Sequence, residues 1–152
     1  MVTILLGDGF EEAEALVPAD LLRRAGVDVT LVGLDGLRVT GGHGITVCAD
    51  RSLEELDPDG VEMLVLPGGM GGVESIQMNL FALALIQRCR DHGCWLAAIC
   101  AAPTILAHLG ILDRRRAVCY PGMEEEMGSA VVQKGARVVA DGRIITGKTS
   151  DL

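Results

Sequence analysis

Short apolar runs alternate with amphipathic segments along the first part of the chain. Residues 2–7 have the pattern of a buried strand, and Glu11–Ala25 carries apolar residues at helical spacing. Pro18 lies inside that second pattern, so we expect a kink there or a helix boundary near Val17. Val27–Val32 alternates as a second strand. A strand, a helix and a strand in this order predict a parallel sheet.

The pattern continues with a hairpin and further strands and helices. Residues 37–49 surround a Gly-rich turn that contains His43, which we expect to be an exposed loop residue rather than a ligand. Ser52 is expected to cap a short helix. The other expected elements are a strand at Glu62–Leu66, a glycine loop at Pro67–Gly72, a helix at Ile76–His92, and short β segments at Ala117–Tyr120, Ala130–Gln133, Arg137–Ala140 and Ile144–Thr146.

Cys100 stands where an apolar strand pattern changes into a helix pattern. Residues 94–99 suit a buried strand, and Pro103 stands where the first turn of a helix tolerates proline. A nucleophile on a tight strand-to-helix turn projects from the sheet edge, and the helix N-terminus favours thiolate over thiol. A cysteine in an apolar run is otherwise a small buried hydrophobe. This segment alone leaves both interpretations open.

A carboxylate is the best candidate for a proton partner of that thiol. Gly7–Glu14 runs from the end of the first strand into a helix and contains three glutamates. It is expected at the same sheet edge as Cys100, where a carboxylate and a thiolate would share one proton. Residue patterns do not distinguish among the three glutamates. No histidine is obviously placed for a Cys/His dyad, since His43, His92 and His108 fall in a turn, a helix end and a helix body.

The composition argues against several classes of protein. The chain has 152 residues, which suits one domain, and a formal charge of −8 argues against nucleic acid or an anionic membrane as partner. Five cysteines without metal-ligand spacing predict neither a disulfide framework nor a zinc site, and a reducing cytoplasm is the expected compartment. The N-terminus lacks the basic region of a signal peptide.

Two sequence features resemble known signatures without the required context. Cys94–Leu112 is a run of 19 uncharged residues, but Pro103 and Gly110 interrupt it, so we expect a strand and a helix rather than a membrane span. Gly142–Thr149 satisfies the P-loop expression, but its intervening residues have a strand pattern and no helix pattern follows. No phosphate-binding loop is predicted there.

Three motifs stand out along the chain: Gly9-Phe10-Glu11-Glu12-Ala13-Glu14-Ala15, Leu66-Pro67-Gly68-Gly69 and Ala97-Ala98-Ile99-Cys100-Ala101-Ala102-Pro103. Together they resemble the ThiJ/PfpI superfamily, in the branch of the Parkinson-disease protein deglycase and its bacterial relatives. The resemblance covers essentially residues 1–152 as a single domain. It implies an α/β, flavodoxin-like three-layer sandwich, mainly parallel with helices on both faces, and a homodimer.

The resemblance also implies roles for individual residues. Cys100 is the nucleophile, Glu14 is its protonated carboxyl partner, and the backbone N–H groups of Gly69 and Ala101 form the oxyanion hole. No metal or cofactor is implied. Peptidase relatives have a histidine directly after the cysteine, where this chain has Ala101. That difference weakens a proteolytic interpretation.

The sequence departs from the family pattern at two places. A histidine twenty positions after the nucleophile in some members is replaced by Tyr120. After Lys148 the family continues through a Gly-Pro-Gly turn into a long helix, whereas this sequence has Thr149-Ser150-Asp151-Leu152. We therefore expect an apolar patch on the sheet face that such a helix would cover.

The function that follows is a cofactor-independent thiol enzyme acting on small reactive aldehydes or glycated groups, of the glyoxalase or deglycase type. Cys100 adds to the aldehyde as a hemithioacetal, and Glu14 transfers the proton between adjacent carbons. The main alternative is an oxidative-stress sensor or chaperone in which Cys100 is oxidised to a sulfinate. A cysteine hydrolase is a third, weaker alternative.

Overall fold

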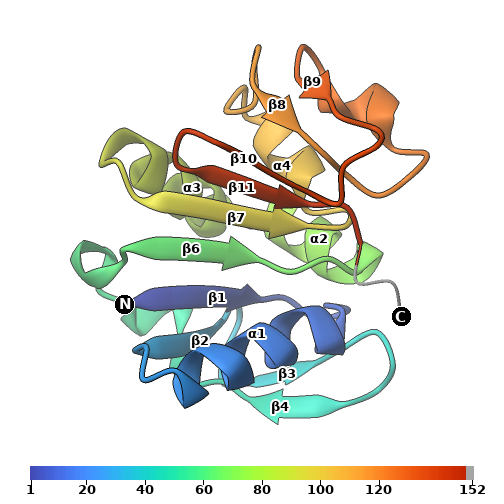
Figure 1. The fold of residues 1–152 in the computed structure, drawn as a ribbon. Helices are drawn as coiled ribbons and strands as arrows, with labels where there is room; N and C mark the ends of the chain where they lie inside the picture. The colour runs from blue at the N-terminus through green and yellow to red at the C-terminus, as the bar shows by residue number, and fades with distance from the viewer. Residues whose placement is uncertain (150–152) are drawn as a thin grey trace.

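A seven-stranded sheet forms the centre of the computed structural model, which describes residues 1–149. Its strands are β1 (Val2–Leu6), β2 (Val29–Gly33), β5 (Arg51–Ser52), β6 (Met63–Leu66), β7 (Trp95–Ile99), β10 (Val138–Asp141) and β11 (Ile144–Gly147). They are arranged in the order β10-β11-β7-β6-β1-β2-β5 (Figure 1). Every neighbouring pair is parallel except β10 and β11. The mainly parallel sheet predicted from the sequence is confirmed.

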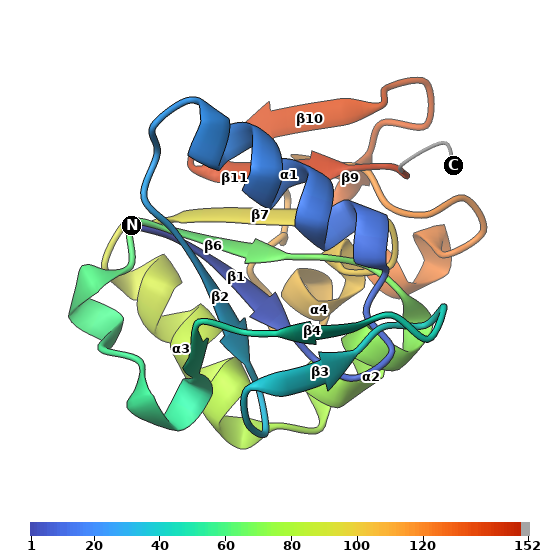
Figure 2. The same cartoon turned by 90° about the horizontal axis from the view of Figure 1, so that it is seen from below.

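Helices cover both faces of this sheet. The α-helices are α1 (Glu12–Arg24), α2 (Met70–Gln77), α3 (Leu80–Asp91) and α4 (Pro103–His108), and the 3₁₀ turns are η1 (Leu53–Glu55), η2 (Pro58–Gly60) and η3 (Glu124–Met127). Helix α1 lies on one face, and α2, α3 and α4 lie on the other (Figures 1 and 2). The flavodoxin-like three-layer sandwich is therefore confirmed. No helix within residues 1–149 is long and apolar enough to cross a membrane.

Alternation along the strands divides the core into two clusters. In β1, Ile4 and Leu6 pack with the α1 layer, whereas Leu5 packs with the α2–α4 layer. This is the expected result of side chains that point to opposite faces in turn. The α2–α4 layer contains the larger cluster, because β6 and β7 also direct their most buried residues there, including Leu64 and Leu96.

The α1 side of the sheet is less completely covered beyond β1. In β7, Leu96 and Ala98 are buried, but Ala97 and Ile99, which point to the opposite face, are only half-buried. In β11, Ile144 is buried and Ile145 is half-buried. Ser150 to Leu152, which carry the end of the departure from the family pattern, lie outside the described residues.

Helix α1 runs without interruption through Pro18, so the expected boundary near Val17 is wrong. Proline removes one backbone donor and crowds the preceding turn. However, Ala15 and Ala19 on either side of it are buried against the sheet and belong to the same core cluster. Tertiary packing of this face outweighs the local cost of the proline.

The helix expected at Ile76–His92 is two helices. Helix α2 begins at Met70, inside the predicted glycine loop, and ends at Gln77. Asn79 then starts α3, because its side-chain oxygen accepts a hydrogen bond from the Ala82 N–H at 3.0 Å. A side-chain N-cap of this kind favours a new helix start over continuation.

The hairpin expected at residues 37–49 is confirmed. It consists of antiparallel β3 (Arg38–Thr40) and β4 (Thr46–Cys48), and His43 lies in the turn between them. The cap expected from Ser52 is wrong, because Ser52 precedes η1 without a side-chain cap hydrogen bond.

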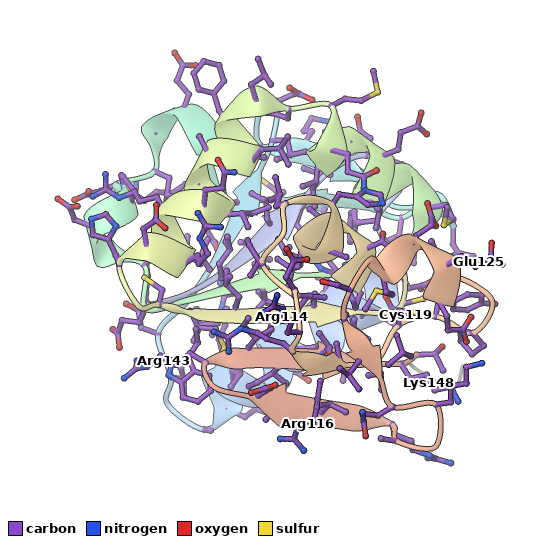
Figure 3. The ribbon with its side chains drawn as sticks, turned by 90° about the horizontal axis from the view of Figure 1, so that it is seen from above. Arg114, Arg116, Cys119, Glu125, Arg143 and Lys148 are labelled. Carbon is purple, nitrogen blue, oxygen red and sulfur yellow. The ribbon has the colours of Figure 1, made fainter. Side chains whose placement is uncertain are left out.

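The last third of the chain contains shorter strands than expected. The segments Ala117–Tyr120 and Ala130–Gln133 reduce to β8 (Arg116–Ala117) and β9 (Val131–Val132), which pair with each other. Three consecutive glutamates lie in η3, and Glu125 among them is exposed to solvent. Cys119, which precedes η3 in the chain, is buried (Figure 3). Within the false P-loop match, Ile144–Gly147 forms strand β11, as expected.

Candidate active site

Cys100 occupies a tight turn between β7 and α4. Its φ of 65° lies in the left-handed region, which a residue with a Cβ adopts only when its surroundings hold it there. Two backbone hydrogen bonds fix this turn: Cys100 N–H donates to the Gly147 carbonyl at 2.9 Å, and Tyr120 N–H donates to the Cys100 carbonyl at 2.7 Å. The sequence-predicted elbow is present.

Glu14 reaches the elbow from the first turn of α1. The residue is 5% exposed, and its Oε2 accepts a hydrogen bond from the Gly68 N–H at 2.8 Å. The Cys100 thiol is hydrogen-bonded to the Glu14 side chain. A Cβ on Gly68 would lie 2.7 Å from the Cβ of Cys100 and would also overlap Glu14 Oε2. Gly68 is therefore the spacer that allows the carboxyl group and the thiol to meet.

The two backbone donors expected beside Cys100 are also brought to it. The N–H groups of Gly69 and Ala101 both hydrogen-bond to the sulfur. Gly69 has a φ of 88°, and a Cβ there would lie 2.6 Å from the backbone nitrogen of Glu11. Glycine is thus needed both for this backbone conformation and for the close approach of the loop before α1.

The thiolate expected from a helix N-terminus is not what this environment favours. Burial raises the pKa of the Cys100 thiol to about 11, and the Glu14 carboxylate acts in the same direction. Hydrogen bonds from Ala101 and Gly69 lower this pKa but do not reverse the shift. Helix α4 has only six residues, so few aligned peptide dipoles oppose the effect of burial.

Glu12, two residues before Glu14, points to a different part of the molecule. Its Oε2 accepts hydrogen bonds from the N–H groups of His43 at 2.8 Å and Ile45 at 3.3 Å, and its Oε1 lies 3.0 Å from His43 Nδ1. Burial alone would raise the pKa of Glu12, but these hydrogen bonds outweigh it and lower the pKa to about 2. Sequence analysis missed this role of Glu12. A step of two residues is about 200° around a helix, so the two side chains had to diverge.

Glu11, Glu12 and His43 form one group with the composition of a metal site. One potential ligand atom from each lies within 4.8 Å of the others. The Glu12 oxygens, however, already accept hydrogen bonds from the β3–β4 turn, and His43 is 68% exposed at its side chain. The contacts of this group are accounted for by attachment of the hairpin to α1.

The remaining histidines are engaged away from the elbow. His92 Nδ1 lies 2.9 Å from the Arg88 carbonyl, and His108 Nδ1 lies 2.9 Å from Gln77 Nε2. Tyr120, which stands at the position of a histidine in some relatives, is 47% exposed and contacts Cys100 through its backbone. The side chain hydrogen-bonded to the Cys100 thiol is therefore a carboxyl group.

Comparison with known proteins identifies a family and several relatives of this chain. The chain matches the DJ-1/PfpI family over residues 1–152. A deglycase of Pyrococcus abyssi is 36% identical over 148 residues, which cover 97% of this chain and 89% of that protein. Protein dj-1beta of Drosophila melanogaster is 35% identical over 147 residues, covering 95% of this chain and 79% of that protein.

A solved structure gives the same result for the fold. The crystal structure of a cysteine-to-alanine mutant of a DJ-1 superfamily protein from Salmonella typhimurium is similar with a TM-score of 0.92 and 34% identity. The match covers 97% of this chain and 80% of that chain. Both the sequence match and the similarity of fold extend over nearly the whole chain, and the chain belongs to the DJ-1/PfpI family.

Proposed function

We propose that this protein is a cysteine enzyme that acts on reactive carbonyl compounds, of the glyoxalase or deglycase type. The observation that carries the proposal is the hydrogen bond between the Cys100 thiol and the buried Glu14 side chain, beside two backbone donors. This arrangement provides a nucleophile, a proton acceptor and oxyanion stabilisation within one small volume.

The first chemical step is addition of the thiol to an aldehyde. The sulfur of Cys100 forms a bond to the aldehyde carbon, the C=O π bond breaks, and Glu14 takes the S–H proton and delivers it to the new alkoxide oxygen. The product is a hemithioacetal. The backbone N–H groups of Gly69 and Ala101, which lie beside the sulfur, would stabilise the negative charge on that oxygen.

The following steps move two protons and add water. For a 2-oxoaldehyde, the Glu14 carboxylate removes the C–H proton of the hemithioacetal to give an enediolate and returns it to the adjacent carbon. The hydroxyl proton on the first carbon passes to the oxygen on the adjacent carbon, which gives a thioester of a 2-hydroxy acid. Water hydrolyses the thioester and regenerates the thiol. The aldehyde carbon is oxidised by two electrons and the adjacent carbonyl carbon is reduced by two, so the reaction requires no external oxidant, reductant or cofactor.

The raised pKa of Cys100 bears on the choice between enzyme and redox sensor. Oxidation to a sulfenate and then a sulfinate proceeds from the thiolate, and a pKa of about 11 leaves Cys100 mainly as the thiol at neutral pH. A thiol with an adjacent base is suited to concerted addition, in which the proton leaves as the carbon–sulfur bond forms. This observation favours the enzyme over a sensor that depends on a low thiol pKa.

Relatives named deglycases, including those of Pyrococcus abyssi and Thermococcus kodakarensis, support the same class of chemistry at family level. A peptidase has less support, because Ala101 follows the nucleophile and the three histidines are engaged elsewhere. The proposed partners are therefore small reactive aldehydes or glycated amino groups.

Two further properties belong to this proposal. All five cysteines are free thiols, which supports a reducing compartment such as the cytoplasm. The outer surface of α1 exposes Val17 and Leu21 at 53% and 59%, which supports its burial in a homodimer. Sedimentation velocity of the wild type and of Leu21→Glu tests the dimer, since a charge in its centre should give monomers.

The test of the activity is lactate formation from methylglyoxal without glutathione. The wild type should form lactate, and Cys100→Ser should not. Cys119→Ser is the matched control, because burial also raises the pKa of that thiol to about 11 and Glu14 is not among the groups acting on it. It should retain activity if it folds, as checked by circular dichroism. A folded wild type that forms no lactate would refute the proposed function for this substrate.

A further inference from the structure

A cavity of about 860 Å³ lies between α3 and the turn η1. Its walls are mainly apolar, and its volume is in the range of pockets that bind organic ligands. The apolar side chains that define it are Leu34, Leu37, Leu53, Leu56, Phe81 and Leu85. None of the candidate catalytic residues lines it, so this cavity is separate from the site around Cys100.

The cavity has the proportions of a groove. Helix α3 and its cap contribute residues from Asn79 to Arg88, and nine helical steps of 1.5 Å amount to about 14 Å. An extended peptide advances about 3.3 Å per residue, so about four residues would span this length. Met78 and Leu80, which flank Asn79 in the chain, are 78% and 79% exposed. A chain segment fits these dimensions better than a compact small molecule.

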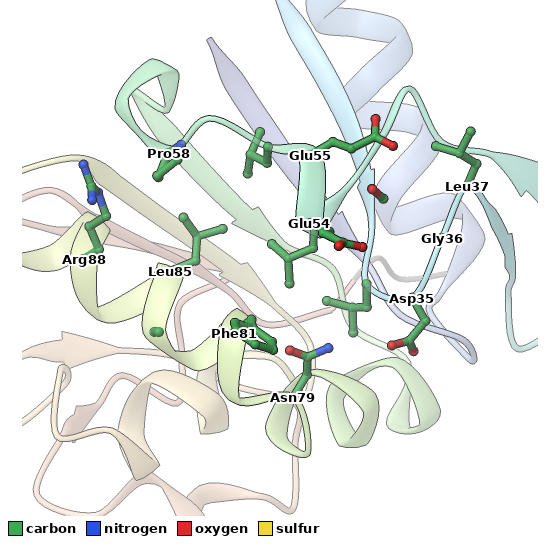
Figure 4. A pocket seen from close by; sticks show the side chains of 15 residues that line it. Asp35, Gly36, Leu37, Glu54, Glu55, Pro58, Asn79, Phe81, Leu85 and Arg88 are labelled. Atoms are coloured by element: carbon green, nitrogen blue, oxygen red, sulfur yellow. The ribbon is translucent and has the colours of Figure 1, made fainter.

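Charge along the groove is unequally distributed. The carboxylates of Asp35 and Glu54 lie towards one end, and the Glu55 carboxylate is directed to the same side (Figure 4). Arg88 lies at the opposite end, where it forms an ion pair with Asp59. Within the part of the chain that the structure describes, no ion pair neutralises the three carboxylates.

Apolar walls and unpaired carboxylates select for a ligand that is apolar in part and cationic in part. We propose that this groove binds an extended segment of a partner protein in which apolar side chains stand next to lysine or arginine. The apolar side chains would contact Phe81 and Leu53, and the cationic groups would lie beside Asp35 and Glu54. Phe81, which is 80% exposed, would lose most of its contact with water in the complex.

A labelled peptide tests this proposal directly. The probe is fluorescein-labelled Lys-Lys-Leu-Phe-Lys-Lys, titrated with the protein and followed by fluorescence anisotropy. Two comparison peptides separate the contributions: Glu-Glu-Leu-Phe-Glu-Glu reverses the charge, and Lys-Lys-Gly-Ser-Lys-Lys removes the apolar centre. Saturable binding of the first peptide, with at least tenfold weaker binding of both others, is expected.

Two pairs of variants localise the binding. Ala84→Trp fills the groove from an exposed position on α3 and should weaken binding at least tenfold, whereas Gln87→Trp, on the same helix but outside the groove, should not. Glu54→Gln with Glu55→Gln should weaken binding about 2- to 30-fold at low salt. Glu125→Gln with Glu126→Gln is the control, since these adjacent exposed glutamates also lie in a 3₁₀ turn.

Several results would overturn the proposal. They are absence of saturable binding up to millimolar protein, equal binding of the basic peptide without apolar residues, equal effects of the control variants, or competition by hexylamine as effective as that of the peptide. The last would indicate a small-molecule amine site. Measurements are repeated with Cys100→Ser, so that the result does not depend on whether the proposed carbonyl chemistry is correct.

Discussion

The first turn of α1 contributes a glutamate to each of two regions of the molecule. Comparison of the two regions shows that one glutamate has a structural role and the other is placed for acid–base chemistry. On the hairpin side, Glu12 accepts hydrogen bonds from two amides of the β3–β4 turn and lies against His43. On the elbow side, Glu14 accepts a hydrogen bond from Gly68 and faces the Cys100 thiol. Both carboxyl groups are buried.

The difference between them lies in what surrounds each carboxyl group. Donors around Glu12 stabilise its charge and lower its pKa to about 2, so it remains an anion at any physiological pH. Beside Glu14 stands a thiol that can exchange a proton with it. A carboxylate saturated by fixed donors holds structure together, and a carboxylate with a titratable neighbour can do acid–base work.

The strongest way to test this division is to neutralise each glutamate in turn. Glu14→Gln should lower the rate of lactate formation about 10²- to 10⁴-fold, the usual contribution of a positioned acid or base. Glu12→Gln should lower it less than tenfold in the fraction of protein that remains folded. Equal losses for the two variants, measured under conditions where both are folded, would contradict the division.

Gly68 separates the carboxyl group from the thiol, so adding one methyl group there should disturb the elbow side alone. In Gly68→Ala the new Cβ would lie 2.7 Å from the Cβ of Cys100, and one of the two must shift. Displacement by about 1 Å costs about 10²-fold in rate. Gly135→Ala is the control, because its Cβ would have no neighbour within 4 Å. A Gly68→Ala variant as active as this control would exclude the spacer role.

The charge of Glu14 should also have a measurable effect on the pKa and the alkylation rate of the Cys100 thiol. Since the Glu14 carboxylate raises the pKa of Cys100, Glu14→Gln should lower that pKa below about 11 and accelerate alkylation by iodoacetamide at pH 8. Cys119 is an internal control in the same mass-spectrometric experiment, because burial and the charges of Glu124 and Glu126 raise its pKa. Unchanged or slower alkylation of Cys100 would contradict the assignment.

On the hairpin side, the expected effect is on stability rather than on rate. Glu12→Gln replaces an oxygen that accepts hydrogen bonds by an NH₂ group and should cost about 1–3 kcal/mol of unfolding free energy at pH 7. Glu12 titrates near 2 in the folded protein against 4.5 in the unfolded chain, so its contribution is complete above pH 4.5.

The contribution of Glu12 should decline as the pH falls from 4.5 to 2. The difference in unfolding free energy between wild type and Glu12→Gln should therefore decrease over this interval, as measured by urea denaturation. Glu11→Gln should show a smaller difference, since the Glu11 carboxylate lies 3.7 Å from His43. A pH-independent difference for Glu12→Gln would show that its charge is not the source of the effect.

Local patterns sufficed to predict the features whose causes are local. The apolar runs gave β1, β6 and β7, and the change of period at Cys100 located the elbow. Family resemblance selected Glu14, and the structure places its side chain at the Cys100 thiol. Continuity of α1 through Pro18 could not be predicted in the same way, because it depends on packing against a sheet assembled from distant segments.

The features of the site that the sequence did not predict also depend on contacts between distant segments. Glu12 receives its hydrogen bonds from residues 31 and 33 positions away in the chain. The raised pKa of Cys100 results from burial and from Glu14, both of which exist only after folding. The groove beside α3 is lined from separate segments at residues 34–37, 52–58 and 79–88. A sequence pattern read in short windows contains none of this information.

The smallest expected effect concerns His43, the exposed member of the hairpin contact. The Glu12 side chain, together with the charge of Glu11, raises the pKa of His43 above 6.5. Protonated His43 therefore stabilises the fold at pH values below 6.5, and the contribution is lost as the pH rises through the folded-state pKa. His43→Ala should accordingly lower the melting temperature more at pH 6 than at pH 9.

Because the His43 side chain is 68% exposed and solvent weakens its pair with Glu12, the effect should be smaller than that of Glu12→Gln at either pH. His92→Ala provides the baseline, since the Nδ1 of its ring lies 2.9 Å from the Arg88 carbonyl at the end of its own helix. An equal loss for His43→Ala at both pH values would show that the charge of the ring is not the source of the effect. No loss at either pH would assign the role of His43 to its backbone N–H, which any residue in the turn would supply.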